Sequence, residues 1–172
     1  MSRRFGAPPD ESRRYVHRAG VYAVLWRGGR ILLTHQARPV PEYQLPGGGI
    51  DPGEAPLRAL HREVREETGW TMAGARRLGV FHRYTYMPEY DIWARKTCVV
   101  YVARPVLCRH APTEPGHTAL LVPPQAAIGL VGNDGDRHFL REVFAAQRHR
   151  SPGSGQIRNS ASVTSSVISR ST

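Results

Sequence analysis

Three glutamates, Glu63, Glu66 and Glu67, lie within one short stretch near the end of a segment with helical periodicity. At about 100° per residue, spacings of three and four residues place all three side chains on one broad face of a helix. Carboxylates gathered on one face repel one another, and hard divalent cations such as Mg²⁺, which prefer carboxylate oxygen, relieve that repulsion. The spacing therefore indicates either a solvated acidic surface or a metal site.

The same helix has an apolar face that fixes how deeply each glutamate lies. Leu57, Leu60 and Val64 recur at three- and four-residue steps, so we expect all three in the core. On a helical wheel Glu67 falls close to Leu60, while Glu66 points further round toward solvent and Glu63 lies between them. Glu67 is therefore predicted to be the least hydrated glutamate and the tightest metal ligand.

Other residues of the segment predict where the helix begins, where it ends and which side chain orients the glutamates. Asp51 to Glu54 is shaped like a capping box with a proline at the first helical position, and Gly69 is a stop signal. Arg62 lies four residues before Glu66 and is expected to orient it by an ion pair. Glu54 is read equally well as a cap or as an outer partner of a metal.

The stretch from Gly48 to Trp70 resembles the signature of the Nudix hydrolase family without a mismatch. The signature reads glycine, five residues, glutamate, seven residues, then R-E-apolar-x-E-E-x-G-apolar; the matching residues are Gly48, Glu54, Arg62, Glu63, Val64, Glu66, Glu67, Gly69 and Trp70. The resemblance implies an α/β/α sandwich with a mixed β-sheet between helices. It also implies Mg²⁺-dependent hydrolysis, with Mn²⁺ as an alternative, of the pyrophosphate linkage of a nucleoside diphosphate joined to another group.

The resemblance assigns residues of this chain to the chemistry. Metal ligands would be Glu63, Glu66, Glu67 and the carbonyl of Gly47, and Arg62 would act with Glu63 and Glu66 in catalysis. The general base is left open, because family members use either a glutamate of the signature or an acid from a loop outside it. The outside candidates are Glu89, Asp91 and Glu114, of which Glu114 best matches the extra ligand position of the family.

Substrate choice depends on the residues after the signature. Gly48 allows backbone to approach a phosphate, Arg38, Arg83 or Arg95 could hold phosphates, and Tyr84, Tyr86, Tyr90 or Trp93 could stack a base. Tyr86 lies 16 residues beyond Trp70, a spacing typical of dinucleoside polyphosphate and RNA 5′-pyrophosphohydrolases. Pro88, 18 residues beyond Trp70, is instead typical of ADP-ribose members. We favour a polyphosphate-bearing nucleotide, and we expect His82, His110 and His117 at the surface.

Composition places few limits on this reading. The formal net charge is +10, but residues 1–18 carry five arginines against two acids, and residues 148–172 carry four arginines and no acid. Most of the excess is therefore at the ends. Two cysteines, Cys98 and Cys108, make no disulfide framework, which favours a reducing cytoplasm. No apolar run approaches membrane-spanning length, so no membrane partner is expected.

The pattern of apolar residues predicts one domain between two polar ends. We expect a polar arm over 1–18, a hydrolase domain over 19–149 and a disordered Ser/Gly-rich tail over 150–172. Expected strands cover 19–26, 31–35, 43–45, 76–86, 97–104 and 120–122, with loops at 88–94 and 105–117. A short helix is expected over 123–130, followed by a helix that Asp134 or Asp136 caps and that buries Phe139, Leu140, Val143 and Phe144.

Two functions of other classes compete with hydrolysis. A Nudix-like domain can be a non-catalytic nucleotide- or RNA-binding regulator, although an intact signature argues against that. The basic ends also suit an RNA-associated protein, and an RNA 5′-polyphosphate is a substrate that joins this idea to hydrolysis. The resemblance further allows a homodimer.

Overall fold

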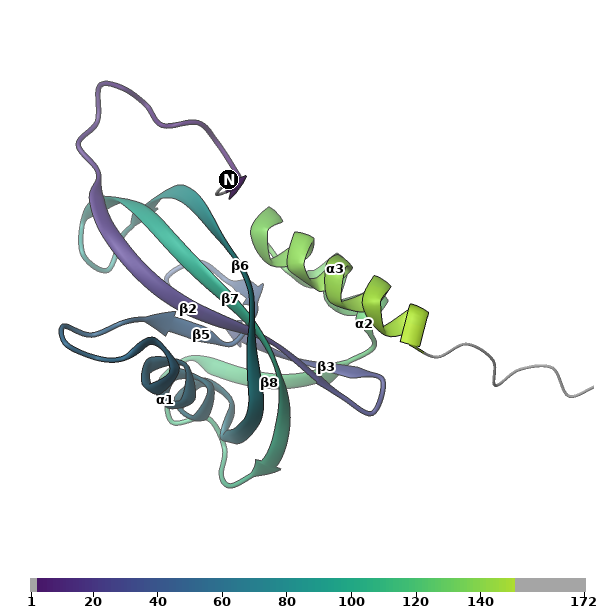
Figure 1. Cartoon of the computed structure of the whole chain (residues 1–172). Helices are drawn as coiled ribbons and strands as arrows, with labels where there is room; N and C mark the ends of the chain where they lie inside the picture. Colours follow the sequence, from purple (N-terminus) through teal and green to yellow (C-terminus); the bar gives the residue numbers. More distant parts are fainter. Residues whose placement is uncertain (1–2, 151–172) are drawn as a thin grey trace, which may run out of the picture.

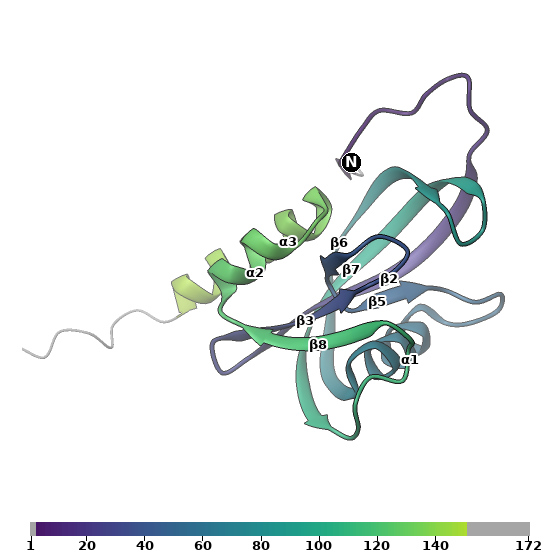
Figure 2. The same cartoon turned by 180° about the vertical axis from the view of Figure 1, so that it is seen from behind.

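The computed structural model describes residues 3–150, and it is an α/β/α sandwich around one mixed sheet (Figures 1 and 2). The strands are β1 (Arg3–Arg4), β2 (Val16–Arg27), β3 (Arg30–Gln36), β4 (Glu42–Gln44), β5 (Gly47–Gly49), β6 (Trp70–Met87), β7 (Ile92–Cys108) and β8 (His117–Val122). The helices are α1 (Pro56–Thr68), α2 (Pro124–Leu130) and α3 (Asp134–Arg150). This architecture confirms the predicted fold class.

The sheet runs in the order β1-β6-β7-β2-β3-β4, with β5 paired to β2 and β8 paired to β3. Helix α1 covers one face, and α2 and α3 lie on the other (Figures 1 and 2). In β2 all six positions from 20 to 25 are buried, because alternate side chains enter two different cores. Tyr22 and Val24 join the core under α3, whereas Val21, Ala23 and Leu25 join the core under α1. Burial on both faces explains the unbroken apolar run of this strand.

Helix α1 confirms part of the prediction for the glutamate segment. Leu60 and Val64 are fully buried, and Gly69 ends the helix with a φ of 74°. Leu57 is 46% exposed, so its predicted place in the core is wrong. The start was also predicted too early. The helix begins with Pro56 after Ala55, which makes no side-chain cap.

The two long strands β6 and β7 extend well beyond the predicted limits and shorten both neighbouring loops. They pair along almost their whole length, and three register shifts interrupt the pairing. Pro105 lies beyond Ala103, the last residue of β7 that pairs with β2, so this part of the strand has an unpaired edge, where proline is tolerated. The predicted loop over 105–117 is therefore reduced to residues 109–116.

At the start of α3 the predicted cap is wrong. The Asn133 side-chain oxygen accepts a hydrogen bond from the Asp136 N–H at 2.8 Å, as an N-cap residue does. The Asp136 carboxylate is buried and instead accepts a hydrogen bond from the Leu45 N–H at 3.0 Å, which ties α3 to the loop before β5. The predicted apolar stripe of α3 is confirmed, with Phe139, Leu140 and Val143 buried and Phe144 half-buried.

The N-terminal arm returns to the sheet. Arg3 and Arg4 pair in parallel with Phe81 and His82 of β6, and the Phe5 ring meets the Phe81 ring edge-on at 5.6 Å between centroids. The predicted disordered tail lies outside the described residues, except for Arg150 at the end of α3. Within residues 3–150, none of the helices combines the length and the apolar character that crossing a bilayer requires.

Candidate active site

Strand β5 and helix α1 hold the site together, and two glycines make their close approach feasible. A Cβ atom on Gly48 would lie 2.5 Å from the Glu63 carboxyl carbon, so only glycine leaves room for that side chain. Gly47 has a φ of 143°, and a Cβ there would lie 2.1 Å from the Val21 carbonyl oxygen. The glycine run predicted to allow close approach therefore does so for the protein's own carboxylate and strand.

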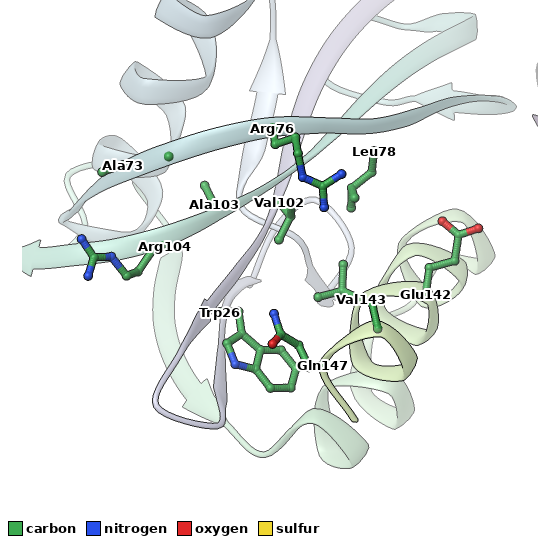
Figure 3. Close-up of a pocket in the computed structure, with 12 residues that line it drawn as sticks. Trp26, Ala73, Arg76, Leu78, Val102, Ala103, Arg104, Glu142, Val143 and Gln147 are labelled. Carbon is green, nitrogen blue, oxygen red and sulfur yellow. The ribbon is translucent and has the colours of Figure 1, made fainter. Parts of the chain in front are cut away.

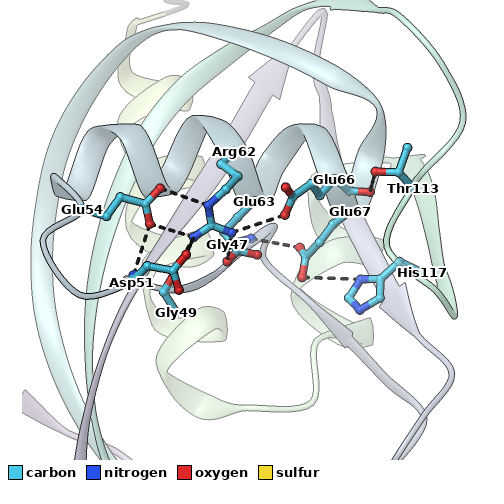
Figure 4. Close-up of polar contacts among 10 residues, drawn as sticks. All are labelled: Gly47, Gly49, Asp51, Glu54, Arg62, Glu63, Glu66, Glu67, Thr113 and His117. Carbon is cyan, nitrogen blue, oxygen red and sulfur yellow. Dashed lines mark hydrogen bonds and ion pairs between the residues drawn. The ribbon is translucent and has the colours of Figure 1, made fainter.

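Glu67 is the most deeply placed acid of the group, as predicted from the helical wheel. Its side chain is 6% exposed, and one oxygen accepts a hydrogen bond from the Gly47 N–H at 3.0 Å (Figure 4). Burial raises the pKa of Glu67 well above its ordinary value, the Gly47 N–H lowers it, and the negative charges of Glu63 and Glu114 raise it further. The metal-free surroundings of Glu67 therefore disfavour its ionised form, which a bound cation would stabilise.

Glu63 and Glu66 follow Glu67 in order of exposure, again as predicted. The Glu63 side chain is 17% exposed and that of Glu66 is 37% exposed. Burial raises the pKa of Glu63 and the Arg62 guanidinium opposes that shift, while Glu66 and Glu114 add to it. The three glutamates thus form one electrostatic group with an excess of negative charge.

Arg62 donates hydrogen bonds to four residues, and Glu66, its predicted partner, is not the one it binds most closely. It donates two hydrogen bonds to Glu54, at 3.0 and 2.8 Å, and one to Glu63 at 2.7 Å (Figure 4). The contact with Glu66 exists but is longer, at 3.3 Å, and a further bond reaches the Gly49 carbonyl at 3.1 Å. Arg62 therefore orients Glu63 more closely than Glu66.

Glu54 does not have the capping role predicted for it, and its alternative role as an outer partner of a metal stays a prediction. It precedes the helix and does not cap it; its carboxylate accepts from the Asp51 N–H at 3.2 Å, closing a turn. The hydrogen bonds from Arg62 lower the pKa of Glu54 to about 2. Glu54 is thus a permanently charged anchor for the Arg62 guanidinium.

The loop over 109–116 brings Glu114 to the glutamates. The N–H groups of Thr113 and Glu114 both donate to the Glu66 carbonyl, at 2.8 and 2.9 Å, so the loop closes over the last turn of α1. The Glu114 side chain is exposed, and its charge raises the pKa of both Glu63 and Glu67. The other two loop acids, Glu89 and Asp91, lie in the turn between β6 and β7, where Asp91 accepts a hydrogen bond from Tyr86.

His117 is a site residue that the sequence did not reveal, and its predicted surface position is wrong. Its side chain on β8 is 8% exposed, with Nδ1 at 3.5 Å from a Glu67 oxygen and 3.0 Å from the Thr34 hydroxyl. Burial lowers the pKa of His117, which favours the neutral ring at pH 7. His110 is exposed as predicted, and the half-buried His82 ring contacts the Thr97 hydroxyl at 3.1 Å.

Lys96 was also not singled out by the sequence. Its half-buried side chain lies on the α3 side of the sheet, with the ammonium 5.6 Å from the centre of the Tyr22 ring. Its positive charge lowers the pKa of Glu67, against the larger effect of burial. A cation on the far side of the sheet therefore acts on the deepest carboxylate of the site.

Gly48 lies against Glu63, but the side chains predicted to bind substrate are not gathered by direct contacts with the glutamates. Arg38 is exposed in the loop after β3, and Tyr86 is exposed near the end of β6. Arg83 is half-buried on the α3 side of the sheet, where its pKa is raised by the charges of Tyr22 and Asp136 against the effect of burial, and its Nε has no hydrogen-bond partner. These assignments stay predictions.

The donor set fits a hard divalent cation, although within residues 3–150 no three acids or histidines already stand in metal-binding geometry. All the candidate donors are oxygens, and the raised pKa values of Glu63 and Glu67 indicate that their ionised forms lack the compensating positive charge that a cation would supply. Arg62 occupies the space between Glu54, Glu63 and Glu66 in this arrangement.

Comparison with known proteins identifies the family to which the glutamate segment belongs. A model of the NUDIX domain matches residues 16–147. A putative 8-oxo-dGTP diphosphatase of Bacillus subtilis (strain 168) is 31% identical over 78 residues, which is 45% of this chain and 52% of that protein. An RNA pyrophosphohydrolase of Francisella tularensis subsp. mediasiatica is 42% identical over 53 residues, covering 31% and 34% of the two chains. The chain spans about half, or less, of the length of these relatives.

Solved structures show the same fold. A NUDIX hydrolase from Nitrosomonas europaea has a TM-score of 0.63 at 18% identity and covers 76% of this chain and 90% of its own. A MutT NUDIX hydrolase from Burkholderia pseudomallei has a TM-score of 0.58 at 26% identity, covering 74% and 98%. The matched domain spans most of the sequence and includes every residue of the glutamate group, and on that evidence the chain belongs to the Nudix family.

Proposed function

We propose that this protein is a metal-dependent pyrophosphohydrolase that cleaves a phosphoanhydride bond of a nucleoside 5′-polyphosphate. The observation that supports this function best is the convergence of Glu63, Glu67 and Glu114 beside a strand without side chains at Gly47 to Gly49. Excess carboxylate charge beside a backbone segment without side chains is the arrangement that suits a cation bridging protein and phosphate.

Glu63, Glu66 and Glu67, with the Gly47 backbone, would hold Mg²⁺ or Mn²⁺. When bound, the ion supplies charge neutralisation on phosphoryl oxygens and lowers the pKa of a bound water. Arg62 keeps Glu63 and Glu66 in place, and Glu54 keeps Arg62 in place. His117, whose ring contacts the Thr34 hydroxyl, supports Glu67 of α1 from the start of β8.

Glu114 is the general base in this proposal. It is exposed, it approaches the glutamates from a loop outside α1, and neither Arg62 nor a backbone N–H neutralises its side chain within the described residues. A free carboxylate in that position can accept a proton from an attacking water. Glu89 and Asp91 are less suitable, because they lie in the turn between β6 and β7.

The name of one relative refers to 8-oxo-dGTP, a nucleoside 5′-triphosphate, and the name of another refers to RNA. A 5′-polyphosphate is a group that both kinds of molecule can carry. Tyr86 and Arg38 are exposed and available to a ligand, and Arg83 has an unpaired Nε. An ADP-ribose-type substrate, which the position of Pro88 favours, is the alternative.

A hydrolysis screen with Mg²⁺ and with Mn²⁺ tests the proposal. The panel contains 8-oxo-dGTP, unmodified nucleoside triphosphates, dinucleoside polyphosphates, 5′-triphosphorylated RNA and ADP-ribose. Glu67→Gln removes the charge and keeps the shape, and Glu11→Gln in the exposed N-terminal arm is the matched control. We expect at least one polyphosphate to be cleaved by the wild type and by the control, and none by Glu67→Gln.

The result also separates the competing functions. Turnover of ADP-ribose alone would replace the polyphosphate assignment. Nucleotide or RNA binding without turnover of any substrate would favour the non-catalytic regulator, and near-normal activity of Glu67→Gln would contradict the metal assignment. Light scattering on the same samples tests the predicted homodimer.

A further inference from the structure

A separate cavity lies far from the glutamates, between the sheet and the last turns of α3 (Figure 3). Its volume is about 410 Å³, within the range of small-molecule sites. Two of the register shifts in the β6–β7 pairing, between Ala73 and Arg76 and between Arg77 and Gly79, fall at its edge. Such irregularities redirect side chains, and here they accompany the gap between sheet and helix.

The walls of the cavity suit a flat aromatic ring. Leu78, Val102 and Val143 form an apolar surface, and the Trp26 ring closes one side (Figure 3). Trp26 is stacked on Phe144 at 6.4 Å between ring centroids, which holds its orientation. The Gln147 amide lies beside Trp26 in Figure 3, where it offers both a donor and an acceptor to the edge of a ring.

The charge of the cavity suits an anion. The Arg76 guanidinium lies over the gap between Leu78 and Val102 in Figure 3, and Arg104 lines the same cavity. Among residues 3–150, neither arginine makes an ion pair. Glu142 is the one carboxylate among the lining residues, and it forms an ion pair with Arg3 at 3.1 Å. The cavity therefore carries unpaired positive charge beside an aromatic wall.

We propose that this cavity is a second, non-catalytic site for a small molecule that joins a planar aromatic ring to an anionic group, as a nucleoside monophosphate does. The ring would stack on Trp26, and the anionic group would pair with Arg76, whose planar fork matches phosphate and carboxylate oxygens. Glu63, Glu66 and Glu67 do not line this cavity, so the proposal is independent of the proposed hydrolysis.

The test is a binding titration of the full chain in EDTA, because without metal the glutamate group repels phosphate. The probes are guanosine 5′-monophosphate, guanosine, inorganic phosphate and benzoate, and the signals of the three tryptophan indole N–H groups are followed by NMR. We expect the monophosphate to shift the Trp26 signal and not those of Trp70 and Trp93. Arg76→Gln should weaken that binding about tenfold, as expected for loss of one charge-assisted contact, without weakening guanosine binding.

Arg77→Gln is the matched control, since Arg77 is the next residue of β6, is exposed and does not line the cavity. It should leave the affinity unchanged. Saturable binding of benzoate but not of the monophosphate would support the aromatic anion and assign it to a carboxylate. Absence of any Trp26 shift at about 10 mM of each probe, or equal losses in Arg76→Gln and Arg77→Gln, would overturn the proposal.

Discussion

Replacing Glu67 by glutamine should stabilise the metal-free protein at neutral pH. The Glu67 side chain is 6% exposed, and Glu63 and Glu114 add negative charge nearby. A glutamine side chain has the same shape, and its oxygen can still accept from the Gly47 N–H. The substitution therefore removes a buried, partly compensated charge without opening a cavity.

The sign of the pH dependence follows from the raised pKa of Glu67. In the unfolded chain this carboxyl titrates near its ordinary value of about 4.3. The folded state holds the proton more tightly, so the stability that the protonated group contributes is present below about pH 4.3 and is lost as the pH rises through the folded-state pKa. Each unit of pKa difference corresponds to about 1.4 kcal/mol. Glu67→Gln should thus match the wild type in acid and exceed it at pH 7.5.

Magnesium should reverse the order of the two proteins. Free ligand at a hundredfold excess over Kd stabilises a folded protein by about 2.7 kcal/mol. At about 2–4 °C per kcal/mol for a chain of this size, the wild type should gain roughly 5–11 °C in Tm. Glu67→Gln, which lacks the ligand predicted to be tightest, should gain much less.

Differential scanning calorimetry at pH 4 and pH 7.5, in EDTA and in MgCl₂, measures both effects. Glu11→Gln controls for the loss of one carboxylate elsewhere. A Glu67→Gln protein that is less stable than the wild type in EDTA at pH 7.5, or that responds equally to MgCl₂, would refute the reasoning.

Three further changes test other contacts. Arg62→Lys removes the paired hydrogen bonds to Glu54, which a point-like ammonium cannot replace; kcat should fall about tenfold, and Glu54→Gln should add little to that loss. Glu114→Gln should lower kcat by roughly 10²–10⁴, as expected for loss of a general base, whereas Glu89→Gln should leave kcat unchanged. Asn133→Ala removes the cap of α3 and should cost about 1 kcal/mol in urea unfolding, with an unchanged m-value; a loss near zero would show that the cap is not needed.

Much of α1 could be predicted because helix geometry is local. The order of exposure of Glu67, Glu63 and Glu66 follows from the angle between successive side chains, and the structure reproduces it. The same reasoning wrongly placed Leu57 in the core. Leu57 lies in the first turn of a helix that begins only at Pro56, and this side chain is exposed. A capping pattern at Asp51 to Glu54 formed a turn instead, since Arg62 binds the Glu54 carboxylate.

By itself, the sequence determined the sandwich fold, the acidic helix face and the family signature, because these depend on periodicity and on residues close together in the chain. Only the tertiary structure decided which distant residues surround the glutamates. His117 contacts Glu67, and the charge of Lys96 lowers the pKa of Glu67. The N–H of Glu114 binds the last turn of α1, and the missing side chain of Gly48 leaves room for Glu63. These contacts join residues that are far apart in the sequence. They are set by the register of β2 with β5 and β7 and of β3 with β8, which no local pattern specifies.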